Sequence, residues 1–216
     1  MRTLSKLLSW VFHPLFILTY VLILLMYANP FLFGFTSIAD GLPQIFTILF
    51  STALIPGIAV ILMSFLNLIK DINLIDKIDR TGPFIIAGIF YLWLFQNLQS
   101  HNNFPEHFTG FVLGSTICLF ICFVLNIVFK VSVHAAAMAG GLVMLIISHS
   151  SGLLLNGVQF GSLYMPDYLL ISIAILLTGL VGYARLKLVA HTLSQVFLGY
   201  LVGIVSVIAG MMIYMK

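Results

Sequence analysis

The residues best suited to chemistry lie between Tyr183 and Gly199, a stretch that joins two long apolar runs. Arg185 and His191 stand six residues apart there, at the edge of a predicted membrane helix. Charged residues make up only 7% of the chain, so this pair needs an explanation. A guanidinium group grips phosphate oxygens in a two-pronged fork, and an imidazole can attack phosphorus or carry a proton. The pattern therefore predicts that the chain binds a phosphate group and acts on it.

Two further polar stretches could supply the rest of such a site. Lys70–Pro83 reads KDINLIDKIDRTGP, and Lys130–Gly141 reads KVSVHAAAMAGG. Both adjoin a predicted helix start, where free backbone N–H groups favour an anion. Phosphoryl transfer needs cations for the equatorial oxygens, a nucleophile and an acid for the leaving group. The phosphate ligands predicted from the three stretches are Arg80, Arg185, Ser132, Lys77 and Lys130.

The elements that must position these residues are membrane helices. The chain has 216 residues, is 62% hydrophobic and has a mean hydropathy of +1.18, far from the values of a soluble domain. Its apolar runs are long and continuous, which excludes the short alternating strands of a barrel. The sequence predicts an all-α polytopic transmembrane helical bundle, a single domain over residues 1–216, with six to seven spans. The seven runs are Trp10–Ala28, Gln44–Ile69, Pro83–Leu98, Phe108–Phe129, Val131–Ser148, Tyr168–Leu188 and Thr192–Met215. Pro14 and Pro56 lie inside two of them and predict kinks.

The distribution of Lys and Arg predicts how the bundle is oriented. If all seven runs cross the membrane, the N-terminus and the connections near 70–82, 130 and 186–191 share one face. Of the nine Lys and Arg residues, only Lys216 falls on the other face. The positive-inside rule then places the N-terminus and the three polar stretches in the cytoplasm. The small net charge of +3, without a basic cluster, excludes nucleic acid as an expected partner.

The order and spacing of these motifs resemble a known family. Residues Ala184 to Gln195 read A-R-x5-H-x3-Q, residues Val131 to His134 read V-S-V-H, and Arg80 precedes Pro83 by three positions. Together they resemble the type 2 phosphatidic acid phosphatase superfamily, whose signatures are K-x6-R-P, P-S-G-H and S-R-x5-H-x3-D. The resemblance covers roughly residues 70–199, and it is nearest to small bacterial members of the superfamily.

The resemblance implies a membrane-embedded phosphatase of lipid phosphates or diphosphates. His191 would attack phosphorus and form a phospho-histidine, and His134 would protonate the leaving lipid oxygen and then activate water. Gln195 occupies the place of the aspartate that orients the nucleophile. The reaction implied uses no metal and no cofactor. The implied partners are a phosphorylated lipid and membrane lipids, and the implied location is the bacterial cytoplasmic membrane.

The sequence also departs from the family pattern. A glutamine carbonyl can accept the imidazole N–H, but it adds no negative charge, and an amide in place of the orienting Asp costs about 10⁴ in rate in serine proteases. The family lysine falls on Asn73, and Val131 and Val133 replace the Pro and Gly of the second signature. The alternative function is therefore a catalytically weakened relative that binds anionic lipid headgroups without turnover.

Several other interpretations stay open. A small transporter component is a second alternative, but it predicts polar residues deep in several spans, where only Asn126, Ser172 and Thr178 occur. The glycine pairs Gly110/Gly114 and Gly199/Gly203 predict close helix packing, either within the chain or in a homo-oligomer. We expect Asp79 to pair with Lys77 or Arg80. His13 either lines the site or bonds a backbone carbonyl, whereas His101, His107 and His149 belong to the opposite side.

Overall fold

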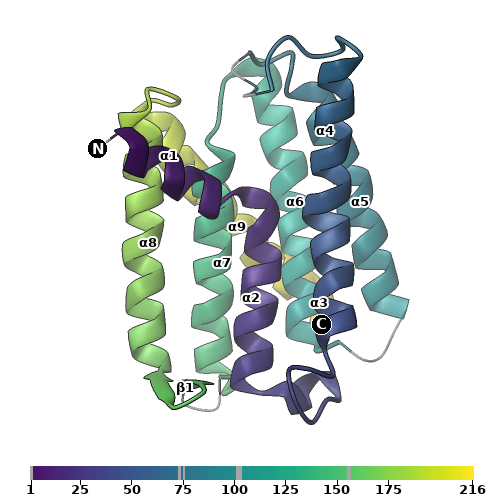
Figure 1. Cartoon of the computed structure of the whole chain (residues 1–216), viewed down its shortest axis with the longest axis vertical. Coiled ribbons are helices and arrows are strands. Elements are labelled where there is room, and N and C mark those ends of the chain that lie inside the picture. The colour runs from purple at the N-terminus through teal and green to yellow at the C-terminus, as the bar shows by residue number, and fades with distance from the viewer. Residues whose placement is uncertain (1, 73, 75, 101–103, 155–156) are drawn as a thin grey trace.

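The chain forms a bundle of long helices that lie side by side (Figure 1). This computed structural model describes residues 2–72, 74, 76–100, 104–154 and 157–216. In chain order the helices are α1 (Arg2–Val11), α2 (Pro14–Ala28), the 3₁₀ turn η1 (Pro30–Phe33), α3 (Leu42–Leu49), the π segment η2 (Phe50–Leu54), α4 (Ile55–Phe65), α5 (Thr81–Ser100), α6 (Glu106–Val128), α7 (Val133–Ser150), α8 (Asp167–Lys187) and α9 (Leu193–Tyr214).

The helix lengths and compositions confirm the predicted helical membrane bundle. Six helices of the described chain are long and apolar enough to cross a membrane, with α3, η2 and α4 together forming one of them, Leu42–Phe65. The α1 and α2 pair passes the same test when the two are taken together. A protein with these helices fits an integral, multi-pass membrane protein.

The first predicted span, Trp10–Ala28, is wrong as a single helix. The chain bends by 62° between α1 and α2. The cause is Pro14, because a proline disfavours helical geometry in the residue before it, and His13 is extended at φ −68°, ψ 140°. Helix α2 is then about 22 Å long, shorter than the ~30 Å hydrocarbon core of a bilayer. Helix α1 crosses one end of the bundle instead of continuing through it (Figure 1).

Helix α1 turns a polar side toward the bundle and an apolar side outward. Its buried residues are Ser5 and Ser9, whereas Leu4 and Trp10 point outward and are 60% and 70% exposed. Exposing Leu4 and Trp10 to water would be unfavourable, whereas the headgroup region of a bilayer accommodates apolar and aromatic side chains of this kind. This distribution of side chains on α1 is typical of a helix that lies at a membrane interface.

The kink expected at Pro56 takes the form of a π segment. Because Pro56 has no N–H to donate, the helical hydrogen bonding widens over η2, just before α4. The hydroxyls of Ser51 and Thr52 in η2 donate to the carbonyls of Thr47 and Ile48. The helix Leu42–Phe65 thereby stays continuous across the proline.

Helix α9 packs closely against both α6 and α7 because glycines remove the side chains between them. A Cβ on Gly114 would overlap the backbone of Val207, and a Cβ on Gly203 would overlap the carbonyl oxygen of Ala136. These glycines therefore serve contacts inside the chain. A homo-oligomer, which stays a prediction, would need another surface.

We expect Gly203→Ala to destabilise the bundle by about 2 to 3 kcal/mol, because the new methyl forces α9 away from α7. The measurement is thermal unfolding in detergent, with a midpoint lowered by roughly 5 °C or more. Gly179→Ala in α8 is the matched control, because nothing lies within 4 Å of its added Cβ. That variant should unfold at or above the wild-type midpoint. Equal midpoints for the two variants would contradict the close packing.

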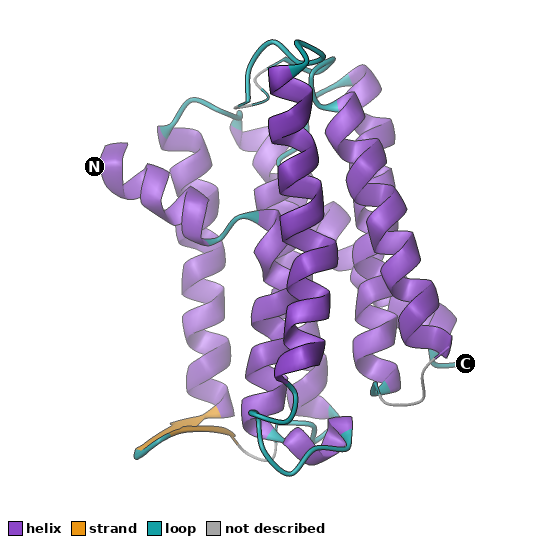
Figure 2. Ribbon diagram, turned by 45° about the vertical axis from the view of Figure 1, so that its right-hand side comes forward, coloured by secondary structure: helices purple, strands orange, loops and turns teal. Residues whose placement is uncertain are grey.

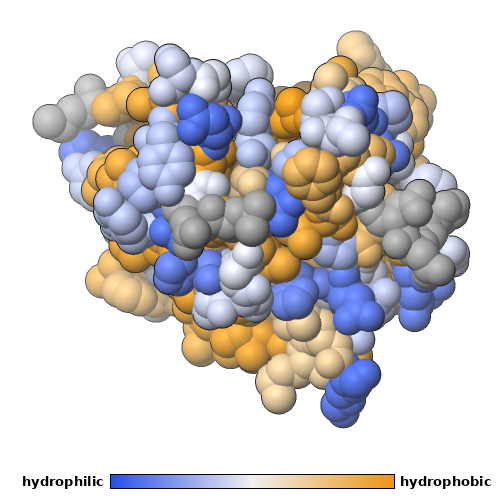
Figure 3. All heavy atoms as spheres, turned by 90° about the horizontal axis from the view of Figure 1, so that it is seen from below, coloured by the Kyte–Doolittle hydropathy of each residue, from blue (hydrophilic) through white to orange (hydrophobic). Residues whose placement is uncertain are grey.

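The two ends of the bundle differ in chemistry. One end carries α1 and the α4–α5, α6–α7 and α8–α9 connections, which confirms that the three polar stretches share a face (Figure 1). The other end carries an antiparallel hairpin that the sequence did not predict, β1 (Gly157–Phe160) with β2 (Leu163–Pro166) (Figure 2). Hydrophilic residues gather among apolar ones over this end (Figure 3).

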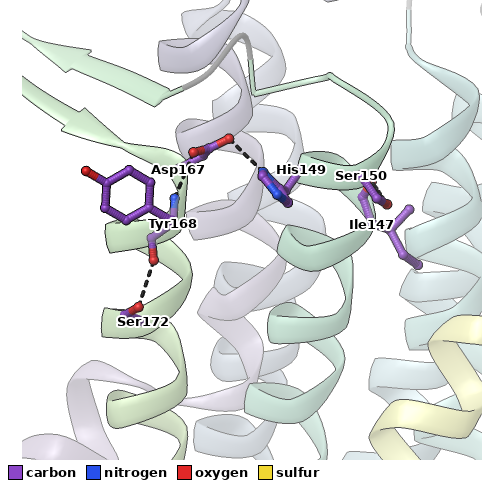
Figure 4. Close-up of polar contacts among 6 residues, drawn as sticks. All are labelled: Ile147, His149, Ser150, Asp167, Tyr168 and Ser172. Atoms are coloured by element: carbon purple, nitrogen blue, oxygen red, sulfur yellow. Dashed lines mark hydrogen bonds and ion pairs between the residues drawn. The ribbon is translucent and has the colours of Figure 1, made fainter.

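His149 of α7 and Asp167 of α8 contact each other at the hairpin end of the bundle. His149 Nδ1 lies 2.6 Å from Asp167 Oδ2, and Asp167 also accepts the Tyr168 N–H (Figure 4). His107 lies at the start of α6, at the same end. Both histidines are thus on the side predicted for them, and His101 falls outside the described residues.

Candidate functional site

A cavity of about 1140 Å³ opens at the α1 end of the bundle. Four of the predicted site residues line it: Arg80, His134, Arg185 and His191. They come from the α4–α5 connection, from the start of α7, from the last turn of α8 and from the α8–α9 connection. We call these four residues the charged end of the cavity. Residues more than a hundred positions apart in the sequence thus face one space.

The start of α9 fixes the chemistry of His191. Thr192 and Gln195 form a capping box at this helix start, in which Gln195 Oε1 accepts the Thr192 N–H at 3.2 Å. His191 Nδ1 lies 3.0 Å from the same oxygen. Because a backbone N–H only donates, that atom must be the amide oxygen, so His191 Nδ1 carries the proton. The lone pair is then on Nε2. The structure confirms that Gln195 can accept the imidazole N–H.

The surroundings of His191 keep it uncharged. Burial lowers the pKa of His191 from 6.5 to about 4; the Gln195 hydrogen bond opposes this, and the charges of Arg185, Arg80 and Lys130 add to it. A histidine with this pKa is neutral at pH 7. Its Nε2 lone pair is therefore available as a nucleophile over the physiological range.

His134 is held by the carbonyl of Ser9, an acceptor from α1. Its Nε2–H donates to that oxygen at 3.1 Å, which leaves the lone pair of the neutral ring on Nδ1. The Ser9 carbonyl lies in the last turn of α1, which ends before Pro14. No later N–H of that helix donates to it, so it is available to His134. The His13 ring packs edge-on against His134, with centroids 5.2 Å apart. Helix α1 thus sets the tautomer of His134 as Gln195 sets that of His191.

Arg80 and Arg185 both face the cavity. Arg80 Nε donates to the Leu74 carbonyl at 2.7 Å, which anchors the side chain, whereas the buried Nε of Arg185 has no hydrogen-bond partner in the part of the chain that the structure describes. Burial lowers the pKa of Arg80, although a guanidinium stays charged at any pH of interest. No ion pair within the described ranges joins either arginine to an acidic residue. Two neighbouring cations that face a cavity are compensated when an anion binds between them.

The remaining predicted ligands lie outside the cavity wall. Lys77 Nζ donates to the Val128 carbonyl at 2.9 Å and so ties the α4–α5 connection to the end of α6. Ser132 is buried as the N-cap of α7, where its hydroxyl accepts the Ala135 N–H. Lys130 is half-buried and acts on His191 only through its charge. Asn73 falls outside the described residues.

The expected pairing of Asp79 is wrong. Asp79 is 5% exposed, and its Oδ2 has no hydrogen-bond partner among the described residues. No ion pair joins it to Lys77 or Arg80 within that part of the chain. Lys77 Nζ instead donates to the Val128 carbonyl at the end of α6, and Arg80 Nε donates to the Leu74 carbonyl.

Lys6 and Ser9 of α1 line the cavity beside His13, and the sequence did not predict these two contributors. The signal was the His13-Pro14 pair, because a proline three positions after the end of a short amphipathic segment marks a break rather than a continuous span. His13 also caps α2, accepting the Leu15 N–H on Nδ1. The two roles predicted for His13 were lining the site and bonding a backbone carbonyl, and the structure places it in the cavity wall.

The polar residues inside the spans serve the backbone. Asn126 donates to the Lys77 carbonyl, Thr178 donates to the Ala174 carbonyl, and Ser172 donates to the Tyr168 carbonyl. None of the three lines the cavity. They give no support to a polar path across the membrane of the kind a transporter uses.

No protein-family model, no curated protein and no solved structure matches the chain. Within the described residues, no group of three or more His, Cys, Asp or Glu side chains could hold a metal ion. The chemistry of the site therefore rests on its own geometry.

Proposed function

We propose that the protein is a membrane-embedded phosphatase of lipid phosphates or diphosphates that works through a phospho-histidine intermediate. The observation that carries this proposal is the charged end of the cavity, where two arginines that form no ion pair with any described acidic residue adjoin a neutral histidine. The phosphate binds between Arg80 and Arg185, whose forks match its oxygens. His191 Nε2 then lies on the same cavity as the bound phosphorus.

The reaction takes place in two displacements. In the first, neutral His134 takes up the proton of the phosphate monoanion on Nδ1, His191 Nε2 forms a bond to phosphorus, the bond from phosphorus to the lipid oxygen breaks, and the leaving alcohol takes that proton from His134. In the second, a water molecule attacks the phospho-histidine, the bond from phosphorus to His191 Nε2 breaks, and His134 Nδ1 accepts the proton that the water loses. Inorganic phosphate leaves with that proton, and both histidines return to their starting states. The two arginines carry the charge of the equatorial oxygens throughout.

The alternative is that the same site binds anionic lipid headgroups without turning them over. Gln195 favours this function, because it orients His191 without the negative charge that would stabilise an imidazolium or raise its nucleophilicity. The experiment that separates the two is phosphate release from a panel of lipid phosphates and diphosphates by the purified protein in liposomes. Binding to such liposomes without release of phosphate would favour the alternative.

We expect Gln195→Glu to raise turnover. A glutamate has the same length as Gln195, so it keeps both hydrogen bonds of the capping box and adds a negative charge beside His191 Nδ1. That charge raises the pKa of His191 from about 4 toward its ordinary 6.5. His191 is then protonated at a higher pH in the variant. The fall of kcat/KM toward acid pH therefore begins at a higher pH, while kcat/KM above that pH increases.

The measurement is kcat/KM against pH for wild type and variant with one lipid phosphate, so that ionisation of the substrate is common to both profiles. Gln195→Met is the matched control, because it has a similar length and no acceptor. We expect it to lower the rate by about 10² to 10⁴. An unchanged acid limb in Gln195→Glu would show that His191 is not the titrating nucleophile.

A further inference from the structure

The cavity continues well beyond its charged end. Along α5 its wall reaches from Arg80 to Tyr91, about 16 Å at the rise of a helix, and along α7 it reaches from His134 to Gly140, about 9 Å. These distances lead into the bilayer, whose hydrocarbon half is roughly 15 Å deep. The cavity is therefore a passage from the polar face into the membrane interior.

The wall of this passage is apolar. Phe84 and Ala87 of α5, Phe111 and Cys118 of α6, and Ile17 of α2 contribute to it. On the membrane side it is bounded by α2 and by Pro56 and Val60 of α4. Water gains few hydrogen bonds in such a space, and a bare phosphate would leave most of it empty. Its volume of about 1140 Å³ lies at or above the range of about 300–1,000 Å³ typical of small-molecule sites.

We infer that one long hydrocarbon chain of the ligand enters this passage, with its phosphate held between Arg80 and Arg185. The ligand class is thus a phosphate ester with a chain that is buried inside the protein rather than left among the bilayer lipids. The charged end matches the phosphate, and the apolar wall matches the chain. Insofar as this ligand is also the substrate, the inference rests on the proposed function.

Ser115 lies in the inner part of the passage. It lies on α6, one turn from Phe111, lines the passage and is half-buried. A phenylalanine at this position would fill the inner part of the passage, and the charged end lies outside its reach. Val124 is the matched control position, because it lies on the same helix, is 59% exposed and is absent from the cavity wall.

The first experiment locates the chain without any turnover. The probe is a long-chain alkyl phosphonate, which cannot be hydrolysed and carries a diazirine at the end of its chain. After irradiation of the full-length protein in liposomes, mass spectrometry should find the adduct on wall residues of α5, α6 or α7. Ser115→Phe should reduce that labelling at least about tenfold, and Val124→Phe should leave it unchanged. Labelling confined to outward-facing residues, or no labelling, would overturn the inference.

The second experiment measures phosphate release from alkyl phosphates that range from butyl to hexadecyl. The ratio of long-chain to short-chain kcat/KM should fall at least about tenfold in Ser115→Phe relative to wild type, whereas Val124→Phe should leave this ratio and the rate with butyl phosphate unchanged. An unchanged ratio in that variant would overturn the inference and leave the phosphatase function intact. Labelling of the passage without phosphate release from any ester would support the inference about the chain and contradict the phosphatase function.

Discussion

Replacing His191 with asparagine should reduce phosphate release by a factor on the order of 10⁴ or more, because the proposed reaction loses its nucleophile. The side chain offers a neutral Nε2 on the cavity, fixed by a 3.0 Å hydrogen bond from Nδ1 to Gln195. Asparagine can keep a polar contact with Gln195, but it has no nitrogen lone pair to attack phosphorus. Binding of a lipid phosphate should survive, since Arg80 and Arg185 are unchanged.

Two measurements test this expectation. Phosphate release is followed over time, and a rapid alkaline quench with labelled substrate should trap a phosphoprotein in wild type that is absent from His191→Asn. His149→Asn is the control, because His149 lies at the opposite end of the bundle and pairs with Asp167 there. Loss of that half-exposed pair should cost at most about 1 kcal/mol of stability and no activity. A phosphoprotein in the His191 variant would contradict the proposed intermediate.

Replacing Arg185 with glutamine should lower kcat/KM by about 10³ or more, because the proposed reaction loses a cation that faces the transferring phosphoryl group. Its buried Nε has no partner among the described residues, and its charge lies close enough to that of Arg80 for the two to repel. Removing one charge should relieve this repulsion, so the variant should unfold at or above the wild-type temperature. A loss of activity with gain in stability is the signature of a residue held for its ligand.

Lys187→Gln is the matched control for Arg185, since Lys187 lies two positions away at the same helix end and is exposed. It removes the same charge from the membrane surface but not from the cavity. The assay measures kcat/KM, affinity for an alkyl phosphonate and thermal unfolding for both variants. Arg185→Lys should recover only part of the affinity, because an ammonium group lacks the two-pronged fork. Equal effects of Arg185→Gln and Lys187→Gln would mean that both side chains only reach toward lipid headgroups.

Local patterns in the sequence predicted much of the site. The contact of Gln195 with His191 could be anticipated because a residue four positions on lies within one helical turn. Arg80, His134 and Arg185 could be placed on one face because an even number of predicted spans separates their connections. Lys77 and Asp79 could not be assigned in this way, because a charged loop offers several partners and only its folding selects the Val128 carbonyl for Lys77.

The contribution of α1 shows where sequence patterns reach their limit. Hydropathy treated Trp10–Ala28 as one run, since it averages over a window and registers no bend at His13. The bend places Ser9 over His134 and leaves its carbonyl free to hold that ring. No spacing in the sequence links positions 9 and 134.

By itself, the sequence determined that this protein is a bundle of membrane helices with its scarce cations and two key histidines at one end. Long apolar runs and the positions of charges fix those properties, because the bilayer acts on each segment separately. Only the tertiary structure decided that Arg80, Arg185, His134 and His191 share a cavity, and that this cavity continues along apolar walls toward Ser115. Such a space depends on which helices are neighbours and on how closely glycines let them approach, and these are properties of pairs of segments rather than of any one of them.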